Sequence, residues 1–147
     1  MAHTFTKNHL HAVFSTKERQ KLIAEDFQPR LWKYVTGICQ NIDLIPVAVG
    51  GRPDHLHLLF HLPPSRSLAD AMRVIKTNSS KWMNEHQERF AWQDGYGAFG
   101  VSESNLPVVV KYIHSQKEHH RKMTFEEEYL ALLKKHGIEF DPRFVFD

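Results

Sequence analysis

The segment 55–62 constrains the fold more than any other, because its sequence His-Leu-His-Leu-Leu-Phe-His-Leu alternates between two kinds of side chain. Successive side chains of a strand point to opposite faces of a sheet. One face of this strand would carry Leu56, Leu58, Phe60 and Leu62, and the other His55, His57, Leu59 and His61. We therefore expect a sheet whose leucine face is covered by helices, with the histidines on the opposite face.

The segments around this strand predict an α+β protein. Two amphipathic helices are expected at 25–40 and from Ser67 to about residue 86, where Ser67 and Asp70 match a capping box. A helix capped by Ser104 would follow, and Thr124 with Glu127 would cap a last helix ending at Gly137. Strands or short β-like pieces are expected at 9–15, 44–49, 55–62, 90–92 and 99–102, with a turn at 50–54.

This order of elements is β-α-β-β-α-β-α with an extra C-terminal helix, and its first six elements match the split βαβ pattern of ferredoxin-like folds. We predict an antiparallel sheet with two helices on one face, which leaves the other face open for a site or a partner. The 147 residues fit one domain, 1–147, with 41% hydrophobic and 24% charged residues.

Composition narrows the function only slightly. The net charge of +2 is compatible with nucleic acid but does not argue for it alone. The single cysteine, Cys39, cannot form an internal disulfide and is expected in the core, which fits a reducing cytoplasm. The sequence shows neither the apolar run of a signal peptide at its start nor the roughly 20 apolar residues of a membrane span.

The histidines of segment 55–62 are candidate metal ligands. His55 and His57 project in parallel and can bind one cation, and Asp54 could orient one of them. Spacing alone leaves a structural role open, because a second triplet, His9-Leu10-His11, has the same pattern.

Tyr112 and Gln116 are four residues apart and would share one helix face, which His119 and His120 roughly continue. A tyrosine beside a metal-bound phosphate can act as a nucleophile, and the Gln116 amide oxygen can bind the same ion. The pattern alone favours a half-buried aromatic role for Tyr112, and it is compatible with an ordinary solvated position for Gln116.

Several motifs in order resemble the HUH single-tyrosine transposases, which include the transposases associated with repetitive extragenic palindromes. The segment 54–59, Asp-His-Leu-His-Leu-Leu, follows Val-Gly-Gly and resembles the His-hydrophobic-His motif, and 112–116 resembles the tyrosine helix. Further similar stretches are Phe14-Ser15-Thr16-Lys17, Phe90-Ala91-Trp92-Gln93, residues 95–99, Val101-Ser102, 118–121, 125–128 and 136–138.

The resemblance implies a homodimer with two active sites acting on single-stranded DNA hairpins at the ends of a mobile element. Tyr112 would attack a phosphodiester to form a 5′-phosphotyrosine and release a 3′-OH, which could later rejoin strands. His55, His57 and Gln116 would hold Mg²⁺ or Mn²⁺, whereas His9 and His11 would be structural, although His11 could border the site. The protein would be cytoplasmic and associate with the nucleoid when bound to DNA.

DNA contacts can be assigned only from charge and aromatic character. Candidates for a phosphate-binding surface are Arg66, Arg73, Lys76, Lys81, Lys111, Lys117, Arg121 and Lys122. Candidates for stacking on bases are Trp92, Tyr96 and Phe99, of which Trp92 and Phe99 could instead be core residues.

Three other functions remain open at this point. A domesticated relative would process chromosomal palindromic repeats with similar chemistry. A non-catalytic nucleic-acid-binding module would leave the Tyr/His/His/Gln set unexplained, and it lacks the aromatic-rich strand motif of RNA-recognition domains. A metal-dependent hydrolase would use water and leave Tyr112 a bystander.

Overall fold

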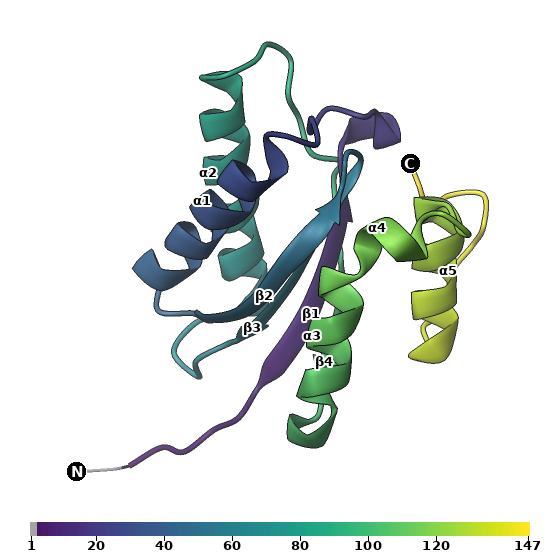
Figure 1. The fold of residues 1–147 in the computed structure, drawn as a ribbon. Helices are drawn as coiled ribbons and strands as arrows, with labels where there is room; N and C mark the ends of the chain where they lie inside the picture. The colour runs from purple at the N-terminus through teal and green to yellow at the C-terminus, as the bar shows by residue number, and fades with distance from the viewer. Residues whose placement is uncertain (1–2) are drawn as a thin grey trace.

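The computed structural model describes residues 3–147 and has a four-stranded antiparallel sheet between two layers of helices (Figure 1). The strands are β1 (His9–Ser15), β2 (Ile45–Arg52), β3 (His55–His61) and β4 (Gly97–Val101), in the order β2-β3-β1-β4. The helices are α1 (Gln28–Asn41), α2 (Leu68–Asn84), α3 (Leu106–His114), α4 (Gln116–His119) and α5 (Phe125–Lys135), with short 3₁₀ turns η1 (Lys17–Arg19) and η2 (Glu103–Asn105). This strand order confirms the predicted ferredoxin-like sheet.

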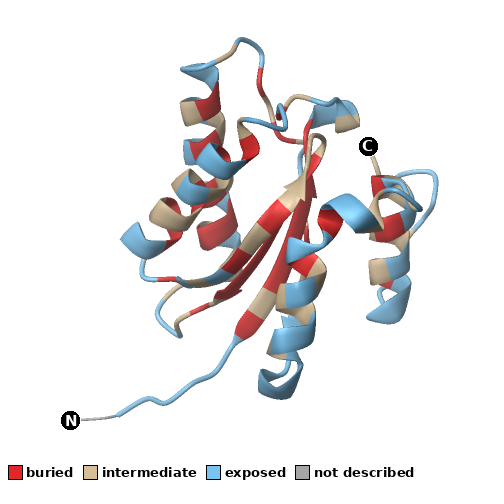
Figure 2. Ribbon diagram, in the orientation of Figure 1, coloured by how far each residue is buried: buried red, intermediate tan, exposed pale blue. Residues whose placement is uncertain are grey.

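The leucine face of β3 packs against α1 and α2 as predicted. Leu56, Leu58 and Phe60 are fully buried in one apolar cluster that includes Leu31 of α1 and Met72 of α2. Figure 2 shows that buried positions run along the strands of the sheet and recur on the helices that cover it. Ser67 caps α2 as expected, because its side chain accepts a hydrogen bond from the Asp70 backbone N–H.

The opposite face of the sheet is not open, contrary to the expectation, because α3, α4 and α5 lie across it (Figure 1). Ile113 of α3 packs on Leu59 and Ala48, and Phe125 and Leu133 of α5 pack near Val13. Gly50 permits the close approach of α3, because a Cβ there would lie 2.4 Å from the Ile113 carbonyl oxygen. The histidine face of β3 is therefore enclosed by the chain's own C-terminal third.

Several predicted boundaries differ from the structure. β4 begins at Gly97 rather than residue 99, and of the piece expected at 90–92 only Trp92 pairs, in an isolated bridge with Thr16. α1 begins at Gln28 rather than residue 25, with Pro29 in its first turn, where the missing N–H costs nothing. β2 extends through Gly50 and Gly51 to Arg52, so the turn is only Pro53-Asp54. Ser104 lies in η2, and the residue that precedes α3 is Asn105.

A further difference concerns the predicted tyrosine helix. Tyr112 and Gln116 do not share one continuous helix, because Ser115 leaves the helical conformation (φ −102°, ψ 20°) between α3 and α4. The last helix was predicted correctly: Thr124 and Glu127 form a reciprocal capping box, and Gly137 adopts a positive φ of 67° just after α5.

Within residues 3–147, no helix combines the length and the apolar character needed to cross a membrane.

Candidate active site

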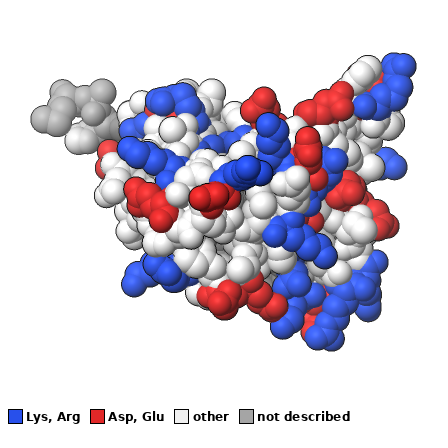
Figure 3. Space-filling model, turned by 90° about the horizontal axis from the view of Figure 1, so that it is seen from above, with Lys and Arg blue, Asp and Glu red and all other residues white. Residues whose placement is uncertain are grey.

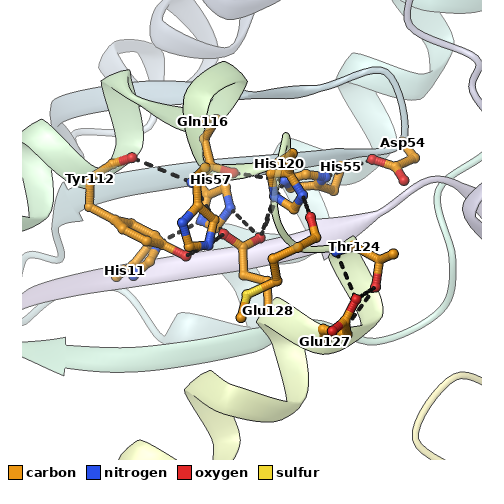
Figure 4. A network of polar contacts seen from close by, with 12 residues as sticks. His11, Asp54, His55, His57, Tyr112, Gln116, His120, Thr124, Glu127 and Glu128 are labelled. Carbon is orange, nitrogen blue, oxygen red and sulfur yellow. Dashed lines mark hydrogen bonds and ion pairs between the residues drawn. The ribbon is translucent and has the colours of Figure 1, made fainter.

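His55 and His57 lie fully buried on the α3–α5 side of β3, and both rings turn their Nε2 atoms toward one point (Figure 4). The His55 Nε2 lies 3.0 Å from the Gln116 Oε1, and the His57 Nε2 lies 3.1 Å from the Glu128 Oε1. The strand alternation places both histidines on this face, and the turn of α4 brings Gln116, 2% exposed, over them. The structure therefore brings together all three residues predicted to bind metal.

Glu128 of α5 is the centre of this cluster, and the sequence analysis missed it. It is 1% exposed, and its carboxylate lies 3.4 Å from the His55 Nε2 and 3.1 Å from the His120 Nε2. Gln116 donates its amide N–H to the second carboxylate oxygen at 3.2 Å. A signal was available in the sequence, since Glu128 follows Phe125 by three residues and lies on the buried side of an amphipathic helix.

The charge of Glu128 is held by its neighbours. Burial alone would raise the pKa of this carboxyl, but hydrogen bonds from His120 and His57 move the pKa well below its usual range. Burial lowers the pKa of its partner His120, but the hydrogen bond to Glu128, the Glu128 charge and the hydrogen bond to the Met123 carbonyl together raise this pKa above its ordinary value. The cluster therefore carries a buried negative charge that is compensated by several donors.

A second ring of contacts fixes the orientation of the two histidines. The His55 Nδ1 lies 2.7 Å from the Asp54 Oδ1, and the His57 Nδ1 lies 2.8 Å from the His11 Nε2. Burial lowers the pKa of His57 to about 4 and that of His11 to about 3, so both imidazoles are neutral at pH 7. Neutral imidazoles with one nitrogen already engaged are the form that binds metals.

The donor set fits a divalent cation. His55, His57 and Glu128 each offer one atom, and these atoms lie within 4.8 Å of one another. Two imidazole nitrogens, a carboxylate and the nearby Gln116 amide oxygen form the mixed nitrogen and oxygen set that divalent metals accept. Among residues 3–147, every fully buried side-chain nitrogen and oxygen atom has a hydrogen-bond partner.

Tyr112 points into the same cluster from α3, as the sequence pattern predicted. Its hydroxyl donates a hydrogen bond to the Glu128 Oε2, and its ring packs edge-on against His57, with the centroids 5.7 Å apart. Burial raises the pKa of Tyr112 above its ordinary value, and the nearby Glu128 charge raises it further. The phenol is therefore protonated at neutral pH, and its oxygen is held beside the histidine and carboxylate donors.

The two His-Leu-His triplets have different surroundings. His9 contacts the ring of His61 and lies 3.7 Å from the Glu103 carboxylate, away from the cluster. His11 borders the cluster through its contact with His57. A triplet becomes a candidate metal site only where other chain segments supply the remaining donors, as α4 and α5 do for His55 and His57.

Comparison with known proteins identifies the relatives of this arrangement. Residues 4–116 match the family described as Transposase IS200 like. This match covers more than half of the chain. The chain belongs to the IS200-like family of single-tyrosine HUH transposases.

Among curated proteins, the ISDra2 transposase TnpA of Deinococcus radiodurans is 24% identical, and the alignment covers 74% of this chain and 83% of that protein. A crystal structure of a protein described as a transposase from the same species superposes with a TM-score of 0.63 at 22% identity, covering 79% of this chain and 96% of the other. The structure of a REP-associated tyrosine transposase bound to a REP hairpin superposes with a TM-score of 0.61 at 16% identity. This match covers 82% of this chain and 73% of the other. These two structures confirm the fold.

The family match ends at Gln116, and residues 117–147 follow the matched region. Glu128 and His120 belong to that segment and close the cluster from outside the matched region. The polar network in Figure 4 is therefore shared between the family region and the C-terminal segment.

The cationic residues proposed for DNA binding lie on both sides of the sheet. On α2, Arg73 and Arg66 pair with Asp70, and the Lys76 ammonium donates to the carbonyls of Gln93 and Gly95, each at 2.7 Å. Lys111, Lys117 and Arg121 lie on or after α3, where Lys117 pairs with Glu25 and Arg121 with Glu118. In the view of Figure 3, acidic and basic side chains are interspersed rather than separated into single-sign regions.

The predicted stacking residues are mostly core residues. Trp92 is 8% and Phe99 2% exposed, and the Trp92 Nε1 donates to the Ser79 hydroxyl. Tyr96 is half-buried at the edge of the main apolar cluster. Of the three aromatic residues, Tyr96 therefore has the most accessible ring.

Proposed function

We propose that this protein is a metal-dependent transposase that cleaves and rejoins single-stranded DNA at hairpin ends through a 5′-phosphotyrosine on Tyr112. One observation carries the proposal: the Tyr112 hydroxyl, the two histidines and Gln116 come from separate parts of the chain and meet at one buried carboxylate. A tyrosine placed only for packing would not need its hydroxyl at the centre of a metal-binding donor set. We take residues 1–147 as a single transposase domain.

The roles follow from the positions of the side chains. His55, His57 and Gln116 would hold Mg²⁺ or Mn²⁺, with Glu128 as an additional ligand, and the bound ion would polarise the phosphate. Tyr112 would form the new bond from its oxygen to phosphorus while the bond from phosphorus to the 3′ oxygen breaks. The phenol loses one proton and the departing 3′ oxygen gains one, so the step is balanced and the 3′-OH is free to reverse it.

We propose further that the protein forms a homodimer in which Tyr112 acts on the site of its own chain. The support is that α3 packs on β2 and β3 of the same chain through Gly50 and Ile113. Mixing Tyr112→Phe with His57→Ala protein tests this. Two defective proteins that exchange helices would regain cleavage, whereas proteins that act on their own sites stay inactive together.

The hairpin substrate is proposed because one structural relative is a REP-associated transposase bound to a REP hairpin. The same relative favours a second candidate function, a domesticated transposase that processes chromosomal palindromic repeats. The two functions share their chemistry and differ in the DNA beside the gene. A mobile element carries its own terminal hairpins, whereas a domesticated gene is flanked by repeats that recur across the chromosome.

A denaturing gel tests the chemistry directly. The protein is mixed with labelled single-stranded hairpin DNA from the sequence flanking the gene, with Mn²⁺ or with EDTA. We expect a metal-dependent, protease-sensitive band that Tyr112→Phe abolishes while binding persists. Cleavage without such a band would favour a hydrolase that uses water, and robust cleavage by Tyr112→Phe would remove Tyr112 as the nucleophile.

A further inference from the structure

A small pocket of about 200 Å³ lies beside the candidate active site, between the end of β1, the loop 93–96, α5 and the C-terminal residues 145–146. Its walls include Ser15, Asp94, Tyr96, Phe125, Tyr129 and Phe146. Three of these residues belong to the segment that follows the family match, which ends at residue 116. The pocket is therefore formed in part by residues that lie outside the family match.

The pocket adjoins the metal-binding histidines on the same face of the sheet. Ser15 is the partner of His55 in the β1–β3 ladder, so the two side chains are cross-strand neighbours. The Phe125 ring stacks on the His55 ring, with the centroids 4.6 Å apart and the planes 27° apart. A group bound in the pocket would thus be separated from His55 by the Phe125 ring.

The lining combines aromatic walls with a few polar groups. The rings of Phe125 and Tyr129 lie 5.5 Å apart, and those of Tyr129 and Phe146 lie 6.0 Å apart. Ser15 is 7% exposed. Within residues 3–147, neither its hydroxyl nor the Asp94 carboxylate forms a side-chain hydrogen bond with another group, and no lysine or arginine lines the pocket.

The size and the lining of the pocket fit a single aromatic ring system, such as one nucleobase. Pockets for drug-sized ligands are roughly 300–1,000 Å³, so about 200 Å³ admits something smaller than a whole nucleotide. Aromatic walls stack on a base, and polar groups at the edge can bond to its hydrogen-bonding edge. The absence of cations from the lining argues against a phosphate.

A second, charged pocket shares the lining residue Phe125 with the aromatic pocket. It has a volume of about 700 Å³ and is bordered by five basic residues and four acidic ones. The basic residues are Arg19, Lys21, Arg52, Arg121 and Lys122. The basic residues of the charged pocket could contact the sugar-phosphate backbone of a strand, while one base of that strand turns into the aromatic pocket.

We propose that the aromatic pocket binds one unpaired nucleobase of the DNA strand next to the phosphodiester that is cleaved, and so selects the cleavage position. This proposal rests on the proposed function and names the part of the strand that the protein itself reads. Because the Asp94 carboxylate only accepts hydrogen bonds, the preferred base presents an N–H to it, as the amino groups of cytosine, adenine and guanine do.

Abasic substitution tests the proposal. The probe is the flanking-sequence hairpin with single-stranded tails, in which each tail nucleotide is replaced in turn by an abasic site. Binding to the full-length protein is measured by anisotropy, and adduct formation by gel. We expect one abasic position near the cleaved bond to weaken binding about tenfold, the usual scale of one stacked base.

Two C-terminal variants locate that effect. Phe146→Ala removes a wall of the pocket, whereas Phe144→Ala removes a ring that is 59% exposed and does not line it. The abasic penalty should vanish in Phe146→Ala and persist in Phe144→Ala. Val145→Phe, which fills the pocket, is a second test, and thermal melting verifies that each variant is folded.

Two outcomes would overturn the proposal. One is a wild-type protein that forms the adduct but tolerates every abasic position. The other is an abasic penalty that is unchanged in both Phe146→Ala and Val145→Phe. Failure of the proposed function is distinct, because the wild-type protein would then form no covalent adduct with any of the probes.

Discussion

The two faces of β3 are built from neighbouring residues but are stabilised in different ways. Leu56, Leu58 and Phe60 pack against α1 and α2 through apolar contacts, which do not require a particular partner atom. His55 and His57, equally buried, each have two specified polar partners. Buried apolar area stabilises whatever it contacts, whereas a buried polar group is costly unless each partner is in place. The first face therefore mainly stabilises the fold, and the second mainly arranges chemistry.

The largest effect is expected on the histidine face. His57→Ala should lower metal-dependent cleavage at least about 1,000-fold, because a bound metal contributes several kcal/mol of transition-state stabilisation. Gel assays with Mn²⁺ measure this, and Mn²⁺ should no longer raise the melting temperature. The matched control is His9→Ala, since His9 begins the other His-Leu-His triplet but lies outside the cluster. Equal losses of cleavage in both variants would show that the effect of His57→Ala comes from removing a buried side chain and not from losing a metal ligand.

On the leucine face we expect a substitution to lower stability and to leave cleavage by the folded protein unchanged. Leu58→Ala removes a fully buried side chain one residue from His57 and should lower the free energy of unfolding by about 2–5 kcal/mol. Urea denaturation measures this. Cleavage by the fraction that remains folded should stay near the wild-type rate. Ile45→Ala, at a residue 59% exposed, is the control and should cost under about 0.5 kcal/mol. A specific loss of cleavage in folded Leu58→Ala would break the contrast between the faces.

A third, smaller effect tests how closely α3 must pack on the histidine face. In Gly50→Ala, the new Cβ would lie 2.4 Å from the Ile113 carbonyl oxygen, so α3 must move away from β2. We expect a loss of about 1–3 kcal/mol in the free energy of unfolding and weaker adduct formation, because Tyr112 moves with the helix. Gly100→Ala is the control, since nothing lies within 4 Å of its added Cβ. Similar behaviour of the two variants would contradict the tight packing.

The leucine face could be predicted from sequence because it depends on local periodicity. The alternation along 55–62 fixes which side chains face α1 and α2, and capping residues such as Ser67 and Thr124 mark helix starts. These signals are contained within a few neighbouring residues. The strand order followed from the order of the elements, which permits few arrangements.

The histidine face could be predicted only in part. His55, His57, Tyr112 and Gln116 were found through motif spacing and family resemblance, and the structure brings them together. Glu128 was missed because helical periodicity can indicate that its side chain is buried but not that it contacts His57, which is 71 residues away in the sequence. The break at Ser115 was missed for a related reason: tertiary contacts that bury Gln116 override the helical pattern of the segment.

The smallest effect concerns which face the DNA backbone follows, and two arginines make a matched pair. Arg73 on α2 and Arg121 after α4 are 68% and 66% exposed, and each pairs with one acidic residue three positions away. Arg121 borders the charged pocket beside the histidine face, whereas Arg73 lies on the helix that covers the leucine face.

Arg121→Ala should weaken hairpin binding a few-fold and reduce the slope of log K against log salt by about 0.7, the value for one phosphate of a single strand. Arg73→Ala should also weaken binding, but by less, since a phosphate must lie near Tyr112 and Arg121 is on that side of the sheet. Anisotropy titrations at several salt concentrations measure both. A larger loss in Arg73→Ala would place the backbone over α2, on the face that otherwise only stabilises the fold, and would show that DNA binding is not confined to the histidine side.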